Sequence, residues 1–140
     1  MARVVTGDDV MMAAREVMLT PWAWGEADCC TSVCDVVLRL FGVDPMADLR
    51  GSYGGQAEAD AMADAVGGFL NLAAGIAAQS GFRAVEGPAW PGDVGVTVAG
   101  VHRPDRRALA ICAGFGGWVC KSPRGLTIVR TVERAWRFAG

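Results

Sequence analysis

The chain changes its sequence pattern near residue 82, and this change constrains the fold more than any other feature. Before it, apolar residues recur at helical intervals over residues 7–18, 29–41, 56–65 and 69–79. After it, short β-branched or apolar runs stand between Gly, Pro and charged turns, at residues 82–85, 93–99, 108–113, 118–121 and 126–132. Helices followed by strands predict an α+β fold in which N-terminal helices pack on one face of a C-terminal antiparallel sheet.

Length and composition predict one domain over residues 1–140. A chain of this size buries most of its apolar surface in a single core, and 52% hydrophobic with 20% charged residues is typical of a compact globule. The net charge of −2, without a basic block, argues against nucleic acid as a partner. The first residues lack the apolar core of a signal peptide, and no window reaches the roughly 20 apolar residues of a membrane span. We therefore expect no membrane span and a protein kept soluble in a cytoplasm.

Local signals mark the ends of the first two helices. Thr6 and Asp9 have the spacing of a capping box, and Pro21 follows the first helix. Asp28 is placed to cap the second helix, which Gly42 closes. The residues that follow Asp28 at core-facing intervals are Cys29, Val33, Val36, Val37 and Leu40.

The second helix begins with a cysteine, Cys29. The positive end of the helix dipole favours a thiolate there, which is typical of a nucleophilic cysteine. Backbone N–H groups at the helix start would then serve as the oxyanion hole for the amide carbonyl under attack. Such a thiol ordinarily needs an imidazole as its general base and acid. The chain has one histidine, His102, more than seventy residues further on in a charged, Pro-containing turn. Cys29 is therefore either an active nucleophile, with His102 as its candidate base, or the vestige of one.

The five cysteines do not form a recognisable framework. Their odd number in a chain without an export signal predicts reduced thiols. Cys30 and Cys34 stand one helical turn apart, and Cys112 and Cys120 flank a Gly-rich turn, but neither pair has the spacing of a structural zinc motif. A cysteine-bound metal or cluster is the less favoured alternative to buried core thiols, and no metal or cofactor is predicted.

Two motifs resemble the NlpC-type papain-like cysteine peptidases, which cut peptide cross-links in bacterial cell walls. These motifs are Asp28-Cys29 and Pro91-Gly92-Asp93. In that family Asp-Cys opens the core helix, Pro-Gly-Asp precedes the first main strand, and the next strand begins with the catalytic histidine. The place of that histidine falls on or near Ala108 here, and the third polar residue falls near Cys120 and Lys121. The resemblance implies a degenerate NlpC-like domain.

Over nearly its whole length the chain also resembles a family of phage and prophage tail-module proteins. That resemblance implies a structural or assembly component of a tail tip or baseplate, made in the bacterial host cytoplasm and carried in the virion with other tail-tip or hub proteins as partners. The alternative is an active cell-wall peptide amidohydrolase used in genome entry, with Cys29 as nucleophile. The motifs that carry the resemblance to tail-module proteins are Trp22-Ala-Trp24-Gly25, Gly42-Val-Asp44-Pro45, Leu49-Arg50-Gly51-Ser-Tyr53, Gly67-Gly68, Pro91-Gly92-Asp93, Ala108-Leu-Ala-Ile-Cys-Ala-Gly114, Gly125-Leu126 and Arg134-Ala-Trp136-Arg.

Trp22, Trp24 and Asp28 are the candidate binding residues. They stand directly before Cys29, where two indole rings are placed to line a groove for a cell-wall peptide or glycan. Packing in the core or against a partner protein is the favoured reading of the tryptophans, because tryptophan buries a large area and is enriched at protein interfaces.

Overall fold

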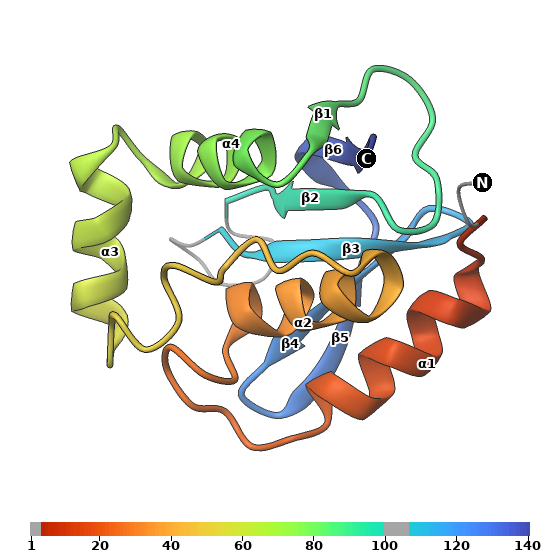
Figure 1. Cartoon of the computed structure of the whole chain (residues 1–140). Helices are drawn as coiled ribbons and strands as arrows, with labels where there is room; N and C mark the ends of the chain where they lie inside the picture. Colours follow the sequence, from red (N-terminus) through yellow and green to blue (C-terminus); the bar gives the residue numbers. More distant parts are fainter. Residues whose placement is uncertain (1–3, 100–106) are drawn as a thin grey trace.

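The computed structural model describes residues 4–99 and 107–140, which form helices packed against an antiparallel sheet (Figure 1). The α+β class is confirmed, with the helices first in the chain and the strands after them. The elements are α1 (Gly7–Met18), α2 (Cys29–Phe41), α3 (Gln56–Ala65), α4 (Phe69–Gln79), β1 (Phe82–Ala84), β2 (Val94–Thr97), β3 (Leu109–Gly114), β4 (Gly117–Ser122), β5 (Gly125–Val129) and β6 (Val132–Phe138).

The six strands form one sheet in the order β1-β6-β2-β3-β4-β5. The last strand of the chain therefore lies between β1 and β2, pairing Ala84 with Trp136 on one side and Val94 with Trp136 on the other. Helices α1 and α2 pack on β3 and β4 and lie in front of the sheet in Figure 1. This arrangement places the start of α2 beside the start of β3.

Alternate residues of the central strands serve two clusters, as the period of a strand requires. Leu109 and Ile111 of β3 join the main core with the buried stripe of α2, in which Val33, Val36 and Val37 are fully buried. The opposite face carries a smaller cluster built from strand residues. The buried members of that cluster are Ala110, Cys112, Trp118, Cys120 and Val129.

The predicted helix limits are confirmed, and the hydrogen bonds explain them. Thr6 and Asp9 exchange side-chain to backbone bonds of 3.0 and 3.1 Å at the start of α1. Gly42 ends α2 in the left-handed region at a φ of 78°, and its N–H donates to the carbonyl of Leu38. Short-range capping and periodicity are local properties of the sequence, so they are visible without the fold.

The end of the sheet corrects the sequence analysis. A single strand was expected over residues 126–132, whereas the structure has β5 over Gly125–Val129 and a separate β6 over Val132–Phe138. Charged residues at 133, 134 and 137 break the apolar run of β6, since much of the strand is only partly buried and Trp136 is its buried residue. The sequence signal for β6 was a period-two pattern of Val132, Trp136 and Phe138, which Arg134 interrupts.

The segment Pro91-Gly92-Asp93 joins the entry of β2 to the end of β6. The buried carboxylate of Asp93 accepts two hydrogen bonds from Arg137, of 2.9 and 2.8 Å, and one of 2.8 Å from the backbone N–H of Trp90. The guanidinium of Arg137 also lies 3.6 Å from the centre of the Trp90 ring. The motif thus has a structural role that is independent of any catalysis.

Replacing Arg137 with Met is expected to lower the free energy of unfolding by about 2–3 kcal/mol, because the buried Asp93 carboxylate loses its charged partner. Urea denaturation followed by circular dichroism measures this change. The matched control is Arg124→Met, at an exposed turn residue, which should cost less than about 0.5 kcal/mol. Equal losses for both variants would contradict the assigned role of the Arg137 pair.

Within the described residues, no single helix is long and apolar enough to cross a membrane, although α3 and α4 together pass that test by length and composition as a pair bent by 75°.

Candidate active site

The loop before α2 is held by one buried carboxylate, that of Asp28. One of its oxygens accepts hydrogen bonds from the backbone N–H and hydroxyl of Thr31, at 2.9 and 3.1 Å. The other accepts from the backbone N–H of Gly25 at 2.8 Å and from the hydroxyl of Tyr53 at 2.6 Å. Asp28 therefore caps the helix and also ties the Trp22–Gly25 loop and the Tyr53 loop to it, which fixes the position of Cys29.

Gly25 makes the close approach of these two loops possible. Its φ is 78°, and a Cβ placed on it would lie 2.4 Å from the carbonyl oxygen of Tyr53. The carbonyl of Gly25 also accepts a hydrogen bond of 3.0 Å from the N–H of Gly51. Only glycine satisfies both demands, because other residues avoid this backbone region and would clash there.

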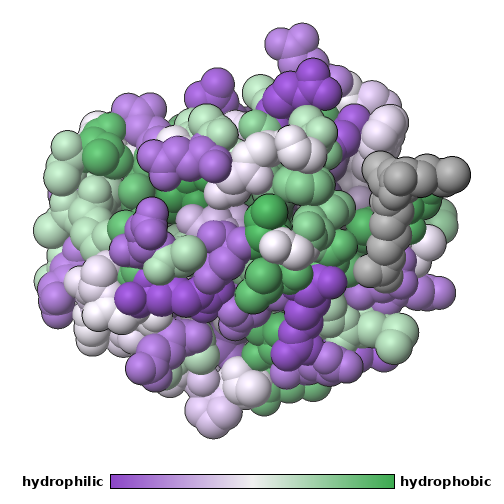
Figure 2. Space-filling view, viewed as in Figure 1, coloured by the Kyte–Doolittle hydropathy of each residue, from purple (hydrophilic) through white to green (hydrophobic). Residues whose placement is uncertain are grey.

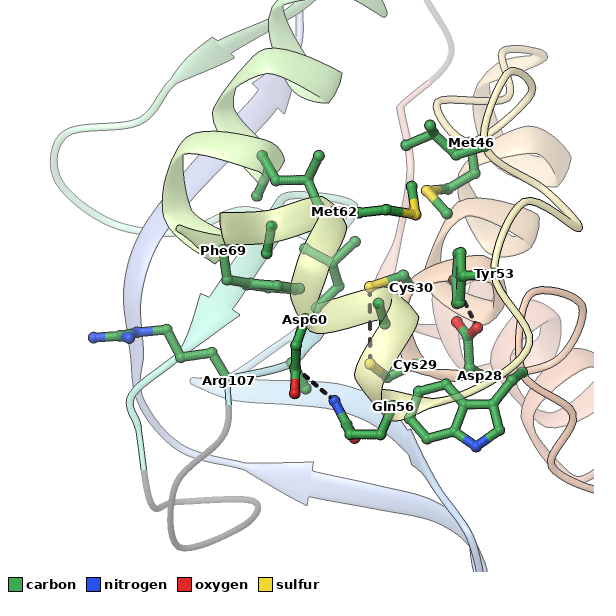
Figure 3. Close-up of a pocket in the computed structure, with 18 of the residues that line it drawn as sticks. Asp28, Cys29, Cys30, Met46, Tyr53, Gln56, Asp60, Met62, Phe69 and Arg107 are labelled. Carbon is green, nitrogen blue, oxygen red and sulfur yellow. Dashed lines mark hydrogen bonds between the residues drawn. The ribbon is translucent and has the colours of Figure 1, made fainter. Parts of the chain in front are cut away.

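Cys29 and Cys30 form a pair of thiols at the start of α2. Their sulfur atoms lie 3.9 Å apart, and the contact is drawn in Figure 3. The pKa of Cys29 is lowered, chiefly because the Cys30 thiol donates a hydrogen bond to its thiolate, and also because backbone amides of Leu109 and Cys30 stabilise the charge. Burial and the Asp28 charge oppose this effect. The pKa of Cys30 is raised well above its ordinary value by the same hydrogen bond and by burial.

The two thiols open into a cavity of about 320 Å³. Trp22 and Trp24 line it from the loop before α2, with their rings in an edge-to-face contact at 5.3 Å between centroids. Helix α3 passes in front of the thiols in Figure 3, while Met46, Met62 and Phe69 extend the cavity away from them as an apolar chamber. The site is therefore a partly covered pocket with sulfur at one end and hydrocarbon beyond it.

Ala108 is the residue on or near which the resemblance puts the imidazole. Ala108 lines the same cavity as Cys29, directly before β3, and its N–H donates a 2.9 Å hydrogen bond to the hydroxyl of Thr97. The neighbouring Leu109 supplies the backbone amide that contacts the Cys29 sulfur. The wall of the Cys29 cavity thus includes a buried alanine, directly before β3, at or near the position for which the resemblance implies a proton carrier.

The position near Cys120 and Lys121, where the resemblance implies a third polar catalytic residue, has a structural role in this chain. Lys121 of β4 is fully buried, and its ammonium donates to the backbone carbonyls of Met18, at 2.9 Å, and Thr20. It holds the end of α1 against the sheet, and burial lowers its pKa. His102, the candidate base, lies outside the described residues, so no imidazole is part of the site as it is described for residues 4–99 and 107–140.

The other three cysteines are buried core residues. Cys34 is buried in the main core and Cys112 and Cys120 in the second cluster. Burial raises the pKa of all three thiols, that of Cys120 to about 12. In the described part of the chain, no group of three or more His, Cys, Asp or Glu residues could hold a metal ion.

Sequence analysis found Cys29, Asp28 and the two tryptophans but missed most of the cavity wall. Tyr53 was part of a recognised loop motif, although nothing local showed that its hydroxyl would bond to Asp28. The sequence predicted the helices α3 and α4 but not the cavity that their apolar side chains line. Their Ala- and Met-rich composition was the available signal, since small and flexible side chains are typical of an adaptable wall.

The fold is α+β, with a thiol at the start of α2, and its architecture is similar to that of an NlpC/p60 domain. The chain is similar to the NlpC/p60 domain of the peptidoglycan hydrolase SagA in its crystal structure, with a TM-score of 0.52 and 16% sequence identity, over 96% of this chain and 100% of that chain. At this identity the likeness shows the fold alone. No curated protein matches the sequence.

The chain belongs to the family described as Domain of unknown function (DUF6950), whose model matches residues 5–138.

Proposed function

We propose that the protein is a structural or assembly component of a phage-type tail tip, built on an NlpC/p60-like scaffold whose acid–base machinery has been lost. The observation that carries this proposal is that the buried Ala108, whose side chain is only a methyl group, lines the cavity of Cys29. The whole-chain resemblance to tail-module proteins supplies the setting, in the virion beside other tail-tip or hub proteins.

Chemistry explains why this methyl group matters. Cleaving an amide requires a proton for the departing amine, and a general acid or base at this step contributes about 10²- to 10⁴-fold in rate. Neither Ala108 nor the engaged Lys121 supplies that proton. Asp28 is also occupied, because both of its oxygens accept internal hydrogen bonds.

Exposed apolar residues support a role in binding partner proteins. Phe115, at the tip of the β3–β4 hairpin, is fully exposed and has a φ of 53°. Met12 and Leu19 are also exposed, on or just beyond α1. On the face shown in Figure 2, hydrophobic patches lie among hydrophilic residues. Apolar surface of this kind is suited to burial against a neighbouring subunit.

The second candidate is an active cell-wall peptide amidohydrolase. It is favoured by the lowered pKa of Cys29 and by the cavity beside its thiol. In this case His102 or a partner chain supplies the base. Trp22 and Trp24 would then bind the cell-wall peptide at the cavity entrance.

Incubation with purified cell wall and with synthetic cell-wall peptides separates the two candidates. We expect no release of free amines above the level seen with Cys29→Ala, because under this proposal the acid–base groups that would protonate the leaving amine have been lost. His102→Ala provides the matched comparison for the base. Release that is lost in both variants would overturn the structural proposal in favour of the hydrolase.

The tail role has a test of its own in a phage that encodes the protein. Deleting the gene is expected to stop tail completion, seen by electron microscopy. Supplying the Cys29→Ala protein should restore intact, infectious particles. Normal tails without the protein would reject the assembly role.

A further inference from the structure

The cavity has two chemically different ends. The thiols of Cys29 and Cys30 occupy one end, 3.9 Å apart. Beyond them the wall is hydrocarbon and thioether, contributed by the loop after α2 and by α3 and α4 (Figure 3). The side chains that make up this apolar chamber are Met46, Leu49, Met62, Phe69, Leu72 and Ile76.

Three of the charged side chains that line the cavity have protein partners, and a fourth, Asp64, is exposed to solvent. Asp60 accepts a hydrogen bond of 2.9 Å from the side-chain amide of Gln56. Asp28 is saturated by Gly25, Thr31 and Tyr53. The guanidinium of Arg107 pairs with Glu133 at 2.8 Å, and its place at the rim is visible in Figure 3. An uncharged, chain-like group therefore suits the interior better than a charged peptide, because burying a charge without a partner is costly.

A thioester is the carbonyl compound that this thiol can attack without a proton carrier. Its leaving group departs as a thiolate, whereas an amine must be protonated to leave. We propose that the cavity binds an acyl chain and that Cys29 accepts this chain from an acyl thioester, becoming S-acylated. This inference does not depend on a role in the tail.

The step balances without any further reactant. The Cys29 thiolate attacks the carbonyl carbon and forms a new carbon–sulfur bond. The tetrahedral intermediate collapses, the carbon–sulfur bond to the donor breaks, and the donor leaves as a thiolate that takes a proton from water. The backbone amides of Leu109 and Cys30 lie at the sulfur that initiates the reaction. The acyl chain then extends past Cys30 into the apolar chamber.

The volume of the cavity limits the length of the chain. A water-sized group occupies about 30 Å³, so a cavity of 320 Å³ holds about ten heavy atoms. An octanoyl group has nine, whereas an acetyl group leaves most of the chamber empty. Burial of each added methylene favours the longer chain.

The test compares the octanoyl and acetyl thioesters of N-acetylcysteamine as acyl donors to the purified protein. Intact-protein and peptide mass spectrometry measure the rate and position of acylation. We expect a single adduct on Cys29, formed at least about tenfold faster from the octanoyl donor. The unfolded protein in urea should lose this preference. Hydroxylamine, which cleaves thioesters, should remove the adduct from the unsubstituted protein, and Cys29→Ser should form no adduct on residue 29.

Two variants separate the chamber from general effects on the fold. Leu72→Gln places a polar group in the chamber wall and should reduce the octanoyl preference by at least about threefold, while acetyl transfer stays unchanged. Leu38→Gln, on the exposed face of α2, is the matched control and should retain the preference. Equal rates for the two donors, or adducts spread over all five cysteines, would overturn the proposal. A folded protein that takes no acyl group from either donor would do the same.

Discussion

At neutral pH, a thiol-selective electrophile is expected to modify Cys29 about a thousandfold faster than Cys120 in the folded protein. The reason is the population of thiolate. The pKa of Cys29 lies below the reference value of 9.0, whereas burial raises that of Cys120 to about 12. Each unit of difference changes the thiolate fraction tenfold. Iodoacetamide labelling followed by peptide mass spectrometry measures the rate at each cysteine.

The pH dependence of this labelling has a definite sign. The thiolate fraction of Cys29 rises with pH, and its midpoint should fall below that of the same cysteine in the unfolded chain. Because the folded pKa is depressed, this ionisation stabilises the fold above the unfolded pKa, and that contribution is lost as the pH falls through the folded pKa. Cys30→Ala removes the hydrogen-bond donor and should move the midpoint upward. An unchanged midpoint in Cys30→Ala would contradict the assigned cause.

Asp28→Ala is expected to lower the free energy of unfolding by about 3–5 kcal/mol, the largest loss we expect from replacing one buried polar side chain. The substitution removes the cap of α2 and leaves the buried Tyr53 hydroxyl and the Gly25 N–H without their acceptor. Urea denaturation measures the loss. The rate of Cys29 labelling should change in parallel, since the loop that positions this thiol is released.

Two further substitutions make this result specific. Tyr53→Phe removes one of the four hydrogen bonds and should cost about 1–2 kcal/mol. Asp48→Ala, at an exposed position after α2, is the matched control and should stay within about 0.5 kcal/mol of the unsubstituted protein. A loss in Asp28→Ala no larger than in Asp48→Ala would contradict the network.

The parts of the fold that sequence analysis predicted are those determined over short distances. The capping box of α1, the Asp28 cap and the left-handed Gly42 depend on residues within one or two turns, and all are confirmed. The division between β5 and β6 was missed because strand pairing is decided by partners distant in the sequence. Trp136 pairs with residues of β1 and β2, which precede it by some forty residues or more.

The candidate site shows the same limit. Cys29 was found because a cysteine after a capping aspartate is a local pattern. The hydrogen bond from Tyr53, the amide of Leu109 and the wall formed by α3 and α4 come from segments far apart in the chain. Lys121 illustrates the point, since its ammonium bonds to a carbonyl 103 residues earlier. A charged residue in a strand gives no sign of such a partner.

The position of β6 has a consequence for when the fold can form during synthesis. The strand that joins β1 to β2 is made after all five other strands of the sheet, and the lysine that secures the end of α1 emerges only shortly before it. The helical half therefore emerges first with its apolar faces uncovered, and the sheet can close only after β6 has been made. Nascent chains stopped before residue 132 would lack the strand that holds the two sides of the sheet together, which makes them natural clients for chaperones and proteases.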